Sequence, residues 1–154
     1  MKKIFTKEEM LKKHKTNIKS ATSSFALSGL LGIIYILRFL IKKNLDFYFS
    51  LSFSELMLRL YDGGKLPSEV TFILVALYIT VFLAIAVSTA KKAKNLRFAL
   101  IFYCFDSFCL IPLALSLGES FSPDFFIDVI LHLFVVIFVS VGIKSEKSIT
   151  KNIK

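Results

Sequence analysis

The sequence predicts an all-α integral membrane protein: an antiparallel bundle of four transmembrane helices, with an N-terminal cytoplasmic amphipathic helix and a short outer interfacial helix. First, 55% of the 154 residues are hydrophobic and the mean hydropathy is +0.69, well above the range of soluble domains. Second, four apolar runs each reach about 20 residues, the length that spans a hydrocarbon core of about 30 Å. Third, lysines and arginines gather at the edges of these runs.

The first predicted element, residues 1–20, is a basic amphipathic helix lying on the cytoplasmic surface. Thr6 and Glu9 have the spacing of a capping box, and Phe5 with Met10 can form the hydrophobic staple across it. Apolar side chains then fall on one side of the helix and lysines on the others, which is typical of a helix at a lipid interface.

The predicted transmembrane domain covers residues 21–143. Its four helices are expected at about 21–41, 69–90, 98–117 and 124–143, joined by an outer loop at 42–68 and followed by a basic cytoplasmic tail at 144–154.

The outer loop contains a predicted short helix at 53–62. Ser52 and Glu55 have capping-box spacing, and a glycine pair follows the helix. Its apolar residues Phe53, Leu56 and Leu60 form a possible docking surface for a partner. Alternatively, the helix merely buries itself among lipid headgroups.

The distribution of positive charge predicts the orientation. The N-terminal tail, the loop between the second and third helices, and the C-terminal tail hold seven, four and four Lys or Arg residues, whereas the two opposite loops hold four together. By the positive-inside rule both termini are expected in the cytoplasm of a multi-pass protein of the bacterial cell membrane. The basic segments suit a bilayer with an anionic inner leaflet. Lysine outnumbers arginine 17 to 3, which argues against nucleic acid as a partner.

Small residues at spacing four predict how two of the helices pack, because close approach of backbones drives helix association in lipid. The predicted seam joins Ser24, Ser28 and Gly32 of the first helix to Ala76, Thr80, Ala84 and Ser88 of the second. A homodimer would be able to use the same stripe.

Four ionisable residues fall inside the apolar runs. Counted inward at the helical rise, Asp106 and His132 lie about 13 and 16 Å from the cytoplasmic side and share a layer. Arg38 and Asp128 form a second layer about 22–25 Å deep. These depths predict two interhelical pairs, Asp106 with His132 and Arg38 with Asp128.

Three interpretations of these pairs remain open. They are structural pins between helices, or Asp106 and His132 form a protonatable transport site, or they are the acid and base of a membrane hydrolase. The third needs a nucleophile in the same layer, where the sequence places only Tyr103 and Ser107.

The remaining chemistry is sparse. Cys104 and Cys109 lie about 140° apart around a helix, so they form neither a redox pair nor half of a zinc site. We therefore expect no metal, no cofactor and no enzymatic activity. The expected function is to bind another membrane component, as an accessory subunit, an assembly or regulatory factor, or an immunity factor. The partner is a membrane protein or a second copy of the chain. The alternative is a small oligomeric proton-linked transporter or channel that uses Asp106 and His132.

Overall fold

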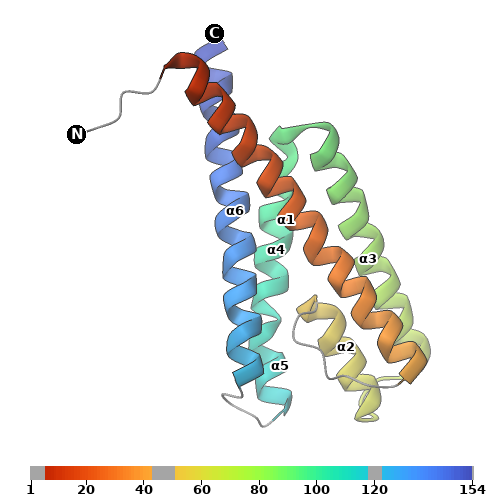
Figure 1. Ribbon diagram of the computed structural model, residues 1–154. Coiled ribbons are helices and arrows are strands. Elements are labelled where there is room, and N and C mark those ends of the chain that lie inside the picture. Colours follow the sequence, from red (N-terminus) through yellow and green to blue (C-terminus); the bar gives the residue numbers. More distant parts are fainter. Residues whose placement is uncertain (1–5, 43–50, 118–122, 154) are drawn as a thin grey trace.

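The computed structural model describes residues 6–42, 51–117 and 123–153, and within these ranges the chain forms α-helices and one short 3-10 turn, with no strand (Figure 1). The elements are α1 (Lys7–Lys42), α2 (Ser52–Asp62), α3 (Ser68–Lys91), η1 (Ala93–Asn95), α4 (Leu96–Phe108), α5 (Leu110–Leu117) and α6 (Pro123–Ile153). Four segments are long and apolar enough to cross a membrane: α1, α3, η1 through α5, and α6. The predicted all-helical fold with four such helices is confirmed.

The first and last helices, α1 and α6, are longer than the sequence predicts. Residues 7–20 are not a separate surface helix, because α1 runs without a break for 36 residues. The predicted capping box is present, with the Thr6 N–H donating to Glu9 at 2.8 Å and the Glu9 N–H to the Thr6 hydroxyl at 3.2 Å. Phe5 of the predicted staple lies outside the described residues. The tail from residue 144 likewise continues α6 to Ile153.

Packing between α1 and α6 explains this continuity. The two helices lie side by side in Figure 1. A side chain at Gly142 would collide with the methyl group of Ala21, so the backbones approach closely there. Beyond this point the Asn17 amide donates to the Ser145 hydroxyl at 3.0 Å. No proline interrupts either helix at the predicted boundary, and Gly142 is held in the helix by its contact with Ala21, so each helix extends along the other.

The predicted seam between α1 and α3 is wrong on the α3 side. Ala76, Thr80 and Ala84 are exposed, and the half-buried Ser88 accepts a hydrogen bond from Asn95 at 2.6 Å. The helix instead turns Tyr78 and Phe82 inward, and the ring of Phe82 covers Gly29 of α1.

On α1 the predicted small residues have other neighbours. Gly32 lies against Leu51, which precedes α2, while Ser24 and Ser28 line a groove beside α6. The physical reason is volume: large side chains, Phe82 at Gly29 and Leu51 at Gly32, fill the space next to the glycines, so small residues need not meet small residues.

The third of the four long apolar segments is interrupted. The predicted single helix at 98–117 is two helices, α4 and α5, with a turn at Cys109. The Cys109 N–H bonds to the carbonyls of Phe105 and Asp106 at 3.3 and 2.9 Å. Pro112 has no N–H to return to the carbonyl of Phe108, which weakens the helix at this point.

The short helix α2 does not lie on the surface. It begins in the interior beside α4 and α6, and its 11 residues run about 16 Å toward the end of the bundle where α3 starts (Figure 1). Leu58 is fully buried, and Leu56 packs against Leu110 and Leu113 of α5.

The residues predicted as a docking surface therefore pack against other helices of the bundle. Leu56 is buried, the Phe53 ring lies 4.7 Å from the Tyr78 ring, and the half-buried Leu60 joins the contact with α5. The prediction fails because a short amphipathic helix packs equally well into a bundle and onto a lipid surface, and periodicity alone does not distinguish the two.

The predicted capping box of α2 is also wrong. Leu51 occupies the capping position and makes no side-chain cap. Glu55 binds Arg59 of the next turn at 2.7 Å, and the Ser52 hydroxyl turns instead to His132 on α6. A tertiary contact has replaced the local one.

Candidate functional site

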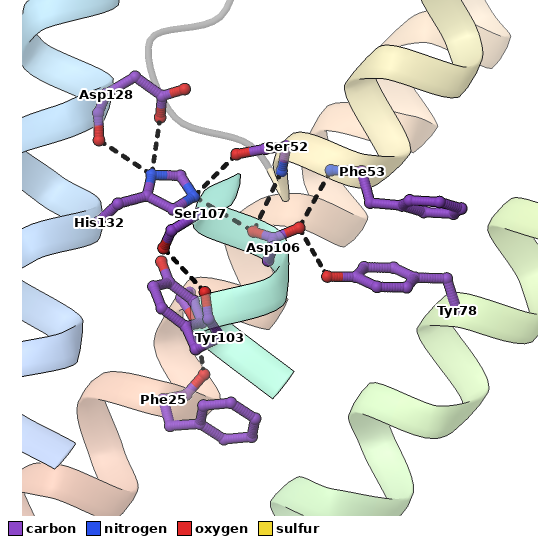
Figure 2. Close-up of polar contacts among 10 residues, drawn as sticks. Phe25, Ser52, Phe53, Tyr78, Tyr103, Asp106, Ser107, Asp128 and His132 are labelled. Atoms are coloured by element: carbon purple, nitrogen blue, oxygen red, sulfur yellow. Dashed lines mark hydrogen bonds and ion pairs between the residues drawn. The ribbon is translucent and has the colours of Figure 1, made fainter. Parts of the chain in front are cut away.

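The centre of the candidate site is the carboxylate of Asp106, a residue of α4 with 0% of its surface exposed. Figure 2 shows its four contacts. The first oxygen, Oδ1, accepts from the Phe53 N–H at 3.0 Å and from the Tyr78 hydroxyl at 2.6 Å. The second, Oδ2, accepts from the Ser52 N–H at 3.2 Å and lies 3.2 Å from Nε2 of His132. The carboxylate thus ties α4 to α2, α3 and α6 at one point.

Asp106 also caps α2. Ser52 and Phe53 are the first two residues of that helix, so their N–H groups have no partner within it. The beginning of a helix carries a partial positive charge that favours an anion. An aspartate distant in the sequence therefore supplies the cap that Leu51 does not provide.

His132 extends the network along α6. Its Nδ1 lies 2.9 Å from the carbonyl of Asp128 and 3.4 Å from the carboxylate of that residue. Since a carbonyl only accepts, Nδ1 donates to it. The other ring nitrogen divides its contacts between Asp106 and the Ser52 hydroxyl, which lies 3.0 Å away. The ring stacks on Tyr103 at a centroid distance of 5.2 Å.

The structure places Asp106 and His132 in contact, as their shared depth leads one to expect. It places Asp128 against His132, one turn away on the same helix. Arg38 is half-buried on α1, and its pairing with Asp128 stays a prediction.

Three parts of the site were not predicted from the sequence. They are the Ser52 hydroxyl, the first two N–H groups of α2, and the Tyr78 hydroxyl. Only Tyr78 carries a signal in the sequence. Its hydroxyl sits in the middle of an apolar run, where a buried tyrosine hydroxyl usually finds a hydrogen-bond partner. The other groups reach the site because α2 enters the bundle, which no local pattern indicates.

The arrangement contains the order of groups used in nucleophilic catalysis. Ser52 lies against Nε2 of His132, and Asp128 lies against Nδ1, as nucleophile, base and orienting group would. This supplies the nucleophile that the hydrolase interpretation lacks in the sequence. However, the Ser52 and Phe53 N–H groups donate to the Asp106 carboxylate, so they are not available to stabilise an oxyanion. Ser52 is itself fully buried, so the geometry favours a structural contact between helices over a catalytic centre.

Within the described ranges no three His, Cys, Asp or Glu side chains gather into a metal site, and Cys104 and Cys109 are free thiols. A comparison with protein-family models, curated proteins and solved structures finds no match. Function is therefore inferred from the geometry and chemistry of the residues themselves.

Proposed function

We propose that this chain is a small multi-pass protein of the bacterial cell membrane that acts without catalysis, by binding another membrane component. In the proposed placement α1, α3, the α4–α5 segment and α6 cross the bilayer in alternating directions, with both termini in the cytoplasm. The four long apolar helices and the lysine-rich segments near the two ends support this placement.

The outward face of α3 carries the proposal. Ala76, Thr80 and Ala84 recur at every fourth position and are all exposed. The Thr80 hydroxyl donates to the Ala76 carbonyl at 2.8 Å, so this face presents no unsatisfied donor. In lipid such small-residue faces are typical of helix–helix contacts, because they let two backbones approach closely. The stripe that fails to pair within the chain is suited to a helix of another molecule.

The buried network supports the same conclusion. The oxygens of Asp106 are occupied by groups of its own chain, and Ser52 and His132 are buried. The buried polar groups thus bond to one another between the helices, and the outward faces of the helices are left to contact a partner. The partner is a membrane protein that this chain assists, regulates or neutralises, or a second copy of the chain.

Photocrosslinking in native membranes tests this proposal. We expect a photoreactive side chain in place of Thr80 to yield one defined protein adduct, and the same group in place of Leu133, an exposed residue of α6, to yield none. Ala84→Leu should abolish the adduct, because a bulky side chain keeps the backbones apart. Adducts with lipid alone at both positions would refute the proposal.

Proton-linked transport is the second candidate, and one observation favours it. His132 lies between two carboxylates, with Nε2 3.2 Å from Asp106 and Nδ1 3.4 Å from Asp128. Intramembrane acid and base groups in a row are the elements of a proton relay.

Proton flux into proteoliposomes containing the purified protein separates the two candidates. If the protein is a transporter, the native chain should give proton flux and Asp106→Asn should abolish it. Asp62→Asn, a change at an exposed residue at the end of α2, should leave the flux unchanged. Flux that is absent in the native chain, or unaltered in Asp106→Asn, would eliminate this candidate.

A further inference from the structure

An open groove with a volume of about 150 Å³ lies between α1 and α6, and none of the residues in contact with Asp106 lines it. Its apolar walls are formed by Leu27 and Leu31 of α1 and by Leu131, Phe134, Val135 and Phe138 of α6. Ser28 also lines it, but its hydroxyl donates to the Phe25 carbonyl at 2.7 Å. An apolar space of this size accepts a hydrocarbon group of about the volume of benzene.

The depth of the groove indicates what fills it. On α1 its wall begins at Ser24 and ends at Leu31, a length of about 10 Å at the helical rise. If the hydrocarbon core begins near residue 21, this wall lies between about 5 and 15 Å deep. On α6 the wall from Phe138 to Leu131 lies between about 8 and 18 Å deep on the same count, so most of the groove lies in the cytoplasmic leaflet of a core of about 30 Å. A transmembrane helix would need a contact surface through both leaflets. An acyl chain of the cytoplasmic leaflet needs only this half.

Charge at the end of the groove indicates the headgroup. Where α1 begins and α6 ends, the two helices carry the lysines Lys7, Lys12, Lys13, Lys15, Lys19, Lys144, Lys147 and Lys151, against the acidic residues Glu8, Glu9 and Glu146. Lys13 precedes Leu31 by five full helical turns and so lies on the same face of α1. Basic clusters at the cytoplasmic ends of transmembrane helices attract anionic lipids.

We propose that the α1–α6 groove binds one acyl chain of an anionic phospholipid of the cytoplasmic leaflet, and that the lysines at the adjoining helix ends hold its headgroup. This inference rests on the proposed membrane placement and orientation, but not on the partner of α3. The lipid would join α1 to α6 on the side of the pair that the chain itself leaves open.

Lipid retention tests the site. The full chain is purified in mild detergent, supplied with equal amounts of phosphatidylglycerol and phosphatidylcholine, and weighed intact by native mass spectrometry. We expect a single phosphatidylglycerol to be retained in preference to phosphatidylcholine. Ser24→Phe should abolish retention because the ring fills the groove. Lys13→Glu combined with Lys19→Glu should abolish the preference for the anionic lipid.

The matched controls introduce the same side chains elsewhere. Leu77→Phe on the exposed face of α3 and Lys65→Glu in the turn after α2 should leave retention and preference unchanged. If Ser24→Phe does not fold, as judged by circular dichroism, Leu27→Trp on the exposed rim of the groove takes its place.

Three results would overturn the inference. The first is equal retention of both lipids by the native chain, and the second is undiminished lipid retention in the folded groove variant. The third is a native chain that binds a second copy of itself instead of lipid and loses that copy in the groove variant. The α3 crosslink reports separately on the proposed function, since the groove variants leave Ala76, Thr80 and Ala84 unchanged.

Discussion

Asp106→Leu should destabilise the protein by about 3–5 kcal/mol, the loss typical of breaking a buried ion pair by removing one partner. The substitution removes the acceptor shared by two N–H groups, the Tyr78 hydroxyl and His132, and leaves all four buried. Asp106→Asn retains one acceptor oxygen but turns an amide N–H₂ toward the remaining donors. We expect it to cost less, about 1–3 kcal/mol. Unfolding by sodium dodecyl sulfate in mixed micelles measures both values.

Hydrogen exchange localises this effect. Because Asp106 caps α2, its loss should expose the amides of Ser52 and Phe53 to exchange before those of the long helices. Asp62→Asn, at the exposed end of the same helix, should change neither stability nor exchange at the beginning of α2. A fully stable Asp106→Leu variant would show that the carboxylate does not hold the bundle together.

His132→Phe is the second substitution with a large expected effect, about 3 kcal/mol. The phenyl ring can keep the stacking on Tyr103, so packing is largely preserved. What disappears is the contact of Nε2 with Asp106 and the Ser52 hydroxyl and that of Nδ1 with the Asp128 carbonyl. Asp106 keeps three of its four donors, and the loss should therefore be smaller than for Asp106→Leu.

A double-mutant cycle separates the pair from its surroundings. The combined variant Asp106→Leu, His132→Phe should lose clearly less stability than the two single losses added together, because neither change then strands a buried charge. Losses that simply add would mean that the two side chains do not interact. Phe98→Leu, at an exposed position on α4, controls for aromatic changes that touch neither the network nor the groove.

The network gives a physical account of an aspartate within a run of phenylalanines. Irregular or terminating backbone at membrane depth is tolerated only where the protein itself satisfies the freed N–H groups. In the proposed placement α2 begins at such a depth, and Asp106 bonds its first two N–H groups. The residue that looks like a catalytic acid in the sequence thereby allows a short helix to begin inside the bundle.

The sequence by itself determined the four apolar helices, the capping box at Thr6 and the shared layer of Asp106 and His132. Each of these follows from length, local spacing or the constant rise of a helix. The predicted helix bounds agree only in part: α3 matches the prediction within one residue at each end, whereas α1 and α6 extend far beyond it because they pack on each other.

Only the tertiary structure decided which faces of the helices turn inward. In a soluble helix the apolar face marks the core, but a helix suited to lipid is apolar on both faces, so its periodicity carries little information. The inward turn of Tyr78 and Phe82, the outward turn of Ala76, Thr80 and Ala84, and the entry of α2 therefore had to come from packing. So did the cap of α2, since its donors and its acceptor lie more than fifty residues apart and meet only when α4, α2 and α6 are assembled.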